Sequence, residues 1–140
     1  MKFICDAPGG KAWFRIETDS EAQQESGLMQ HAVEKYFRRE REKAVQSYQP
    51  SPGTAYIERD IGLNDHIQRQ MPLFLTLRDA EGNGLATAML PPGGSRTAGF
   101  HIIIVGRANR DPYPSEGEAI AALGKRFGQT LDRGSCFPYA

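Results

Sequence analysis

The chain has 140 residues, of which 39% are hydrophobic and 24% are charged, and its 17 basic and 17 acidic side chains give a formal net charge of zero. This length and composition predict one globular domain over residues 1–140 and exclude a disordered chain, which needs fewer apolar residues and a larger net charge. The charge balance argues against a dedicated nucleic-acid-binding domain, because phosphate contacts require an excess of basic residues.

The two cysteines and the absence of long apolar stretches bear on the compartment. Cys5 and Cys136 lie near opposite ends of the chain, and their spacing fits neither a disulfide framework nor a zinc motif. The N-terminal residues lack the apolar region of a signal peptide, and no stretch approaches the roughly 20 apolar residues of a membrane span. We therefore expect a cytoplasmic protein, not bound to a membrane and without a metal or other cofactor.

The N-terminal part predicts a β-hairpin followed by one long helix. Residues 2–5 and 12–17 read as strands joined by a Pro-Gly-Gly turn. The helix is predicted over about residues 18–48, where Thr18 and Glu21 form the capping-box pattern at its start. Its apolar side chains recur at three- and four-residue steps: Ala22, Met29, Val33, Tyr36 and Phe37. A helix of this length spans about 45 Å, more than a compact domain needs.

The second half of this helix predicts a dimer surface. Six consecutive charged residues, 38–43, interrupt the apolar stripe, which resumes at Ala44, Val45 and Tyr48. These three side chains need a partner beyond the charged segment, and a second copy of the chain would cover them in a two-fold homodimer. The alternative is a bend, near Gly27 or at the charged segment, that folds the rest of the helix back onto the domain.

The middle of the chain predicts a strand, a short helix and a second hairpin. Residues 55–61 read as a strand, and a short helix is expected over about residues 64–71, ended by Pro72. A β-hairpin is predicted over about residues 73–90. Its signal is the Asn83-Gly84 pair between two apolar runs, because both residues tolerate positive φ.

The last part predicts a central strand and a C-terminal helix. Residues 101–105 contain a continuous apolar run, which is typical of a strand covered on both faces. Ser115 and Glu118 form a second capping-box pattern, at the start of a helix over about residues 115–131. Residues 136–139 read as a final strand. The order of elements predicts an α+β fold with one mostly antiparallel sheet and helices packed against it.

The loop after the predicted central strand is the candidate ligand site. The chain contains no P-loop, dinucleotide fingerprint, nucleophile elbow or metalloprotease motif. Arginine binds carboxylate or phosphate through two parallel hydrogen bonds, and a helix N-terminus favours anions. We expect an anion pocket made by Arg107, Asn109 and Arg110, closed by Arg96 from the preceding Gly-rich loop. The alternative is a solvated loop whose arginines pair with Asp111 and Glu116.

The three histidines predict no metal site, because no two of them have the i, i+4 spacing of helical metal ligands. They are His31, His66 and His101. His66 lies near Asp60, Asp65 and Arg69, which makes it the candidate for acid–base chemistry.

These patterns favour a non-enzymatic binding or protein-interaction protein, acting through the dimer surface, the anion pocket or both. A small enzyme acting on an anionic metabolite, with His66, Arg107 and Arg110 in its site, is the first alternative. The second is a nucleic-acid-binding accessory protein that uses Tyr36 and Phe37 beside the charged segment 38–43 for stacking and phosphate contacts.

Overall fold

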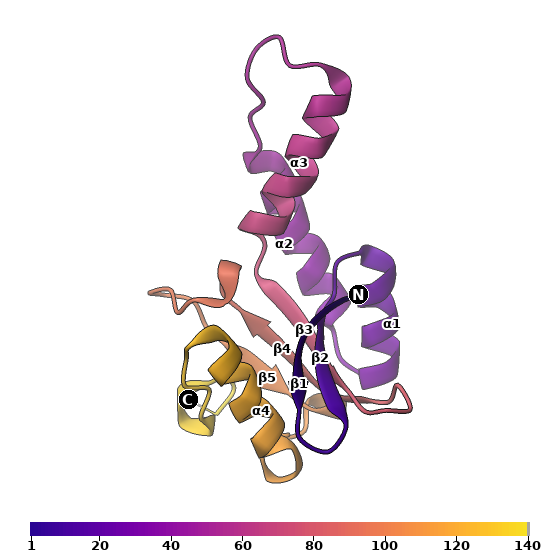
Figure 1. Cartoon of the computed structure of the whole chain (residues 1–140), viewed down its shortest axis with the longest axis vertical. Helices are drawn as coiled ribbons and strands as arrows, with labels where there is room; N and C mark the ends of the chain where they lie inside the picture. Colours follow the sequence, from indigo (N-terminus) through magenta and orange to yellow (C-terminus); the bar gives the residue numbers. More distant parts are fainter. Residues whose placement is uncertain (140) are drawn as a thin grey trace.

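A computed structural model describes residues 1–139 and shows one antiparallel sheet with helices on both of its faces (Figure 1). Its five strands lie in chain order: β1 (Lys2–Ala7), β2 (Lys11–Arg15), β3 (Leu73–Arg78), β4 (Gly84–Leu90) and β5 (Ile103–Val105). The helices are α1 (Asp19–Met29), α2 (Val33–Ser47), α3 (Tyr56–Gln70) and α4 (Tyr113–Phe127), with short 3-10 turns η1 (Pro92–Gly94), η2 (Arg107–Asn109) and η3 (Arg133–Ser135). The predicted α+β class, antiparallel sheet, N-terminal hairpin and C-terminal helix are confirmed.

One face of the sheet is fully packed against α4. Leu75 and Leu77 point to this face, alternating along β3 with residues that point to the other face, and lie in one apolar cluster with Ile120 and Leu123 of α4. Trp13 of β2 is completely buried there, and its indole Nε1 donates a hydrogen bond to the carbonyl of Ala119 at 2.8 Å. This buried layer fixes α4 on the sheet.

The other face is covered only in part, by α1 and α2. Phe74 of β3 points to this side and packs against Phe37 of α2, with their ring centroids 5.3 Å apart. The side chains of Met89, Ile103 and Val105, which belong to β4 and β5, are only half-buried. The helices therefore leave this edge of the sheet open.

The structure corrects the single long helix predicted over about residues 18–48. The capping box at Thr18 and Glu21 is present, but α1 ends at Met29 and Gln30 adopts a left-handed conformation with φ of 54°. Polar groups support the break: the Glu34 N–H donates to Ser26 Oγ at 2.8 Å, and the ring of His31 bonds to Thr87. The apolar stripe continues in phase across residues 30–32, so its periodicity gave no sign of the break.

The chain after the break forms a helical hairpin that projects from the sheet (Figure 1). This segment, residues 33–70, consists of α2, a loop and α3, and we call it the arm. Residues 55–61, predicted as a strand, form the start of α3 instead, and the predicted helix over 64–71 is only its second half. Ile57 and Ile61 have the i, i+4 spacing of one helix face, a pattern that the strand interpretation overlooked.

The second predicted hairpin is confirmed, but its turn differs in detail. Positive φ occurs at Gly82 and not at the Asn83-Gly84 pair. The Asp79 carboxylate accepts hydrogen bonds from the N–H groups of Glu81 and Asn83 at 3.0 and 2.8 Å. An aspartate-centred loop therefore closes the hairpin where the sequence predicted a two-residue turn.

The strand predicted as central, residues 101–105, lies at the edge of the sheet as β5. Among residues 1–139, its outer side is bridged only at Phe137, whose N–H donates to the carbonyl of Ile102 at 2.7 Å. The predicted final strand over 136–139 is reduced to this single bridge. Alternate residues of β5 therefore divide between the α4 face, where Ile104 is buried, and the open face.

Candidate functional site

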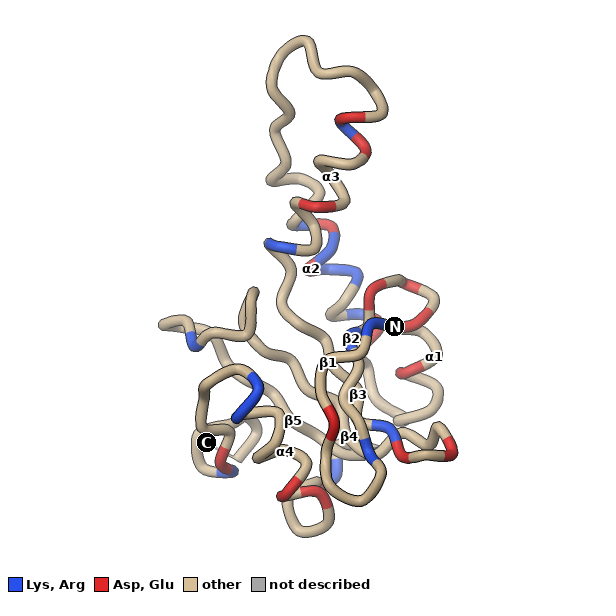
Figure 2. The backbone as a smooth tube through the Cα atoms, in the orientation of Figure 1, with Lys and Arg blue, Asp and Glu red and all other residues tan. Residues whose placement is uncertain are grey.

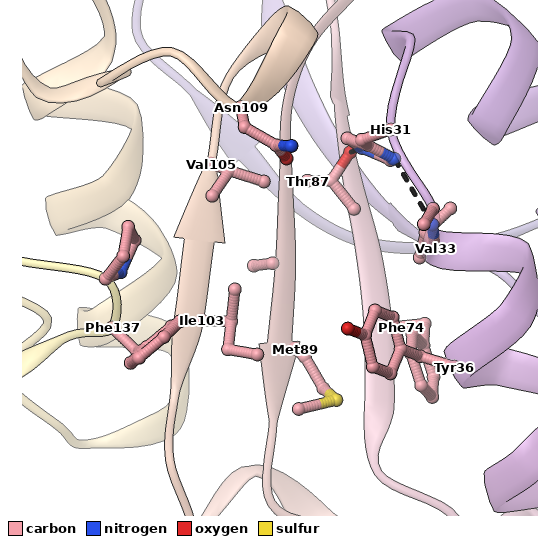
Figure 3. A pocket seen from close by; sticks show the side chains of 13 residues that line it. His31, Val33, Tyr36, Phe74, Thr87, Met89, Ile103, Val105, Asn109 and Phe137 are labelled. Carbon is pink, nitrogen blue, oxygen red and sulfur yellow. Dashed lines mark hydrogen bonds between the residues drawn. The ribbon is translucent and has the colours of Figure 1, made fainter.

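The open part of the sheet forms one wall of a groove (Figure 3). It has a volume of about 410 Å³ and lies between the start of α2 and the strands β4 and β5. Most of its lining is apolar, and the larger of these side chains are Val33, Tyr36, Phe74, Met89, Ile103 and Phe137. Pockets that bind small molecules have this size and this predominantly apolar character.

Polar side chains gather at one end of the groove, where Figure 3 shows Asn109, Thr87 and His31. Asn109 and its neighbour Ala108 both have positive φ, near 59° and 55°, which is uncommon for residues other than glycine. The Gly106 N–H supports this turn by donating to the Arg110 carbonyl at 2.7 Å. The backbone N–H of Asn109 donates to the Gly106 carbonyl at 3.1 Å, but its side-chain amide makes no hydrogen bond within residues 1–139, so the donor and the acceptor of this amide remain available to a ligand.

A buried carboxylate lies behind this polar end. The Glu25 side chain is completely buried; its Oε1 accepts from Arg78 at 2.7 Å and its Oε2 accepts from the Thr87 hydroxyl at 2.7 Å. Thr87 Oγ1 also lies 2.8 Å from Nε2 of His31. Since the single hydroxyl proton points to Glu25, Thr87 must accept a hydrogen bond from the Nε2–H of His31. We call these four residues, His31, Thr87, Glu25 and Arg78, the buried polar chain.

Both ring nitrogens of His31 are engaged, which argues against a role in acid–base catalysis. Nε2 donates to Thr87, and Nδ1 accepts from the Val33 N–H at 3.4 Å (Figure 3). Burial lowers the pKa of His31, and the opposing effect of the Glu25 charge is smaller. A general base needs a free nitrogen that faces its substrate. His31 therefore holds the α1–α2 turn against β4.

The lowered pKa of His31 predicts that stability depends on pH. As the pH falls below about 6.5, the ordinary pKa of imidazole, the unfolded chain takes up a proton that the folded chain does not. The free energy of unfolding should therefore be constant above this pH, fall below it, and level off below the lowered pKa of the folded state. Urea unfolding at a series of pH values above about 5, where few carboxylates titrate, measures this. The His31→Gln variant should lose this pH dependence of the free energy of unfolding, and a His101→Gln control should keep it. If the free energy of unfolding of His31→Gln still falls with pH as in wild type, another group causes the effect.

The structure places the residues of the predicted anion pocket at two ends of α4. Arg107 and Arg110 are exposed on the turn that carries Asn109, before α4 begins. Arg96 instead donates to the Thr130 carbonyl at 3.3 Å, beyond the C-terminal end of this helix. A helix of 15 residues spans about 22 Å, so Arg96 does not close a pocket with the other two arginines.

The acids proposed as partners of these arginines pair with other residues. The Asp111 carboxylate accepts from Arg133 at 2.8 Å. The Glu116 carboxylate accepts from Lys11 at 2.7 Å. Among residues 1–139, neither Arg107 nor Arg110 forms an ion pair. Both residues are exposed, on the same turn as Asn109, which lines the polar end of the groove.

The residues predicted for acid–base chemistry and dimerisation lie on the arm. His66 Nε2 is 2.7 Å from Ser47 Oγ, and its ring packs on Tyr48, so it joins α3 to the end of α2. Ala44 is buried in the apolar cluster of the arm, and Tyr48 lies against Gly62. In this arrangement α3 of the same chain supplies the cover that we expected from a second copy. Of the three predicted dimer residues, Val45 remains exposed.

The structure shows an α+β protein with a mostly apolar groove on the partly covered face of an antiparallel sheet. No family model, curated protein or solved structure matches this chain. Among residues 1–139, no helix combines the length and apolar character that crossing a bilayer requires. The same residues contain no group of three or more His, Cys, Asp or Glu side chains arranged to bind a metal.

Proposed function

We propose that this protein is a non-enzymatic binding protein and that the groove is its binding site for an apolar or amphipathic group. The observation that carries the proposal is the incomplete cover of the sheet. Met89, Ile103 and Val105 face the groove from β4 and β5, where α1 and α2 leave them half-buried. Removing such side chains from water contributes about 25 cal/mol for each Å² of apolar surface, so an apolar ligand group is stabilised there.

The polar end of the groove supports an amphipathic ligand with an anionic end. The Asn109 amide orients a hydrogen-bonding group, and Arg107 and Arg110 supply positive charge on the same turn. Our proposal therefore retains anion binding by Asn109, Arg107 and Arg110 and leaves out Arg96. The engaged nitrogens of His31 favour binding over acid–base catalysis. The free thiols of Cys5 and Cys136 support a cytoplasmic location, where cysteines remain reduced.

Titration of dilute protein with the anionic amphipathic dye anilinonaphthalene sulfonate (ANS) tests the proposal. We expect saturable fluorescence enhancement at one site, and about a tenfold or greater loss of affinity in Ile103→Asp, because a carboxylate would replace an apolar wall of the groove. The fluorescence of the dye must be followed, since Trp13 lies on the opposite face of the sheet and does not report on the groove.

A matched control is Phe3→Ser, which removes an exposed apolar side chain from β1 at the other edge of the sheet. This variant should keep the wild-type affinity for ANS. Equal affinities of wild type and Ile103→Asp, with both proteins folded by circular dichroism, would refute the groove as the binding site.

A further inference from the structure

The end of the arm carries the most exposed large apolar side chains among residues 1–139. Tyr56, Ile57 and Ile61 are 84%, 75% and 65% exposed, and we call residues 56–61 the tip. These side chains are exposed because α2 and α3 do not end at the same level of the arm. Because Tyr48, which follows α2, packs at Gly62 and His66, the first turns of α3 extend beyond the end of α2 (Figure 1). Only the loop between the helices accompanies them.

The tip is opposite in charge to the base of the arm, by which we mean the first half of α2. The tip carries Glu58 and Asp60 with one arginine, Arg59, an excess of one negative charge (Figure 2). The first half of α2 carries three basic residues, Lys35, Arg38 and Arg39, with Glu34 and Glu40, an excess of one positive charge. The three basic residues line a shallow hollow along α2 together with Glu34 and Glu42, and this hollow shares His31 and Ala32 with the groove. An acidic apolar tip thus has a basic apolar counterpart at the opposite end of the arm.

We infer that the natural partner of the groove is the tip of a second copy of this chain. The inference rests on the proposed function, because it names the occupant of the same groove. Two arms related by a two-fold axis run antiparallel, so that each tip reaches the base of the other arm. Ile57 and its apolar neighbours then cover Tyr36, Ile103 and Phe137 of the second copy, and the acids of the tip face the basic side of α2.

Because of the two-fold symmetry, the dimer contains the contact between tip and groove twice. Each copy supplies the missing cover of the other copy's sheet. The net charge of zero adds no overall repulsion between copies. The proposed dimer therefore uses the tip and the groove, and not the surface of Ala44, Val45 and Tyr48 that the sequence indicated. Of these three residues, Ala44 is buried and Tyr48 is half-buried against Gly62.

Sedimentation velocity of the full chain over a range of concentrations tests the pairing. Wild type should show a reversible monomer–dimer equilibrium, and Ile57→Asp and Ile103→Asp should each remain monomeric. Phe3→Ser should dimerise like wild type. A wild type that stays monomeric at every concentration would refute the inference while leaving the groove proposal to the ANS titration. Assemblies that grow beyond the dimer would refute the two-fold arrangement.

Charge reversal gives a sharper test, because it changes only exposed residues, whose contacts within the chain are surface interactions such as the Arg38–Glu34 ion pair. One variant has a basic tip, Glu58→Lys with Asp60→Lys, and the other has an acidic base, Arg38→Glu with Arg39→Glu. Each alone juxtaposes like charges and should dimerise about 100-fold more weakly than wild type. An equimolar mixture restores opposite charges at both contacts and should form a heterodimer with nearly wild-type affinity. No recovery in the mixture would refute the tip-to-base contact.

ANS separates failure of this inference from failure of the proposed function. If the tip occupies the groove, the apparent affinity of wild type for ANS falls as the protein concentration rises and dimers form. Ile57→Asp should bind ANS equally well at all concentrations. The same ANS affinity in wild-type monomer and dimer would show that the groove remains free in the dimer and would overturn the assignment of its occupant.

Discussion

Replacing Glu25 by Gln is expected to lower the free energy of unfolding by about 3 kcal/mol, because it removes one partner of a buried ion pair. The Glu25 carboxylate is fully buried and accepts from both Arg78 and Thr87. A glutamine amide has one acceptor oxygen for these two donors, and its NH2 group would face a donor. The neighbouring cation would then lack its counter-charge in a poorly solvated site. Urea unfolding near neutral pH, followed by circular dichroism, measures the loss.

The matched control is Glu40→Gln, in an exposed pair with Lys43 at 3.5 Å on α2. Exposed pairs of this kind contribute roughly 0–1 kcal/mol, so this variant should remain close to wild type. A second readout is the pKa of His31, which the Glu25 charge raises. Glu25→Gln should therefore lower that pKa further in an NMR titration. Similar losses of stability for the two glutamine variants would show that the buried polar chain does not stabilise the fold.

The elements that the sequence predicted well are those determined by local patterns. The two hairpins depend on turn residues and alternation within a short segment, and the C-terminal helix depends on the periodicity of its apolar residues. The capping box predicted at Ser115 and Glu118 is wrong, because the helix begins at Tyr113 and its N-cap, Pro112, has no side-chain cap. The helix expected over residues 115–131 is observed as Tyr113–Phe127, ending at Gly128 in a left-handed conformation.

The elements predicted incorrectly depend on contacts between distant segments. The break at residues 30–32 is supported by Thr87 of β4, more than 50 positions away in the chain. The edge position of β5 depends on Phe137, and the apolar run over 102–105 is compatible with either an edge or a central strand. Periodicity within one segment contains no information on these partners.

The groove was missed for the same reason, since its walls come from five separate segments: residues 31–36, 74, 87–89, 103–109 and 137–138. Among the residues predicted to bind a ligand, Asn109 lines the groove, with Arg107 and Arg110 on the same turn. One overlooked signal was Glu25, which lies between Ala22 and Met29 on the buried side of α1. A carboxylate on the apolar face of a helix requires a buried partner, and this requirement marks the polar chain behind the groove.

Different residues of α2 face the sheet and the groove, so the stability of the arm and the proposed binding in the groove can be tested with different variants. Phe37 and Tyr36 are adjacent in sequence but point in different directions, since successive residues are about 100° apart around a helix. Phe37 is 1% exposed and packs edge-on against Phe74, whereas Tyr36 is 46% exposed and lines the groove. Phe37 therefore fixes the arm on the sheet, and Tyr36 faces the groove in which we propose that a ligand binds.

Phe37→Ala should accordingly lower the free energy of unfolding by about 3–5 kcal/mol, through lost apolar contact and the cavity left beside Phe74. Tyr36→Ala should cost less than about 1 kcal/mol, because its ring is largely solvated and interacts mainly with Arg39 in a cation–π contact. Although Tyr36→Ala has the smaller effect on stability, it should weaken the binding of ANS in protein that remains fully folded. Denaturant unfolding and dye titration on the same two preparations measure both effects. If Tyr36→Ala leaves the ANS affinity unchanged, the binding surface does not include the start of α2, and both the groove proposal and the tip-to-groove pairing fail.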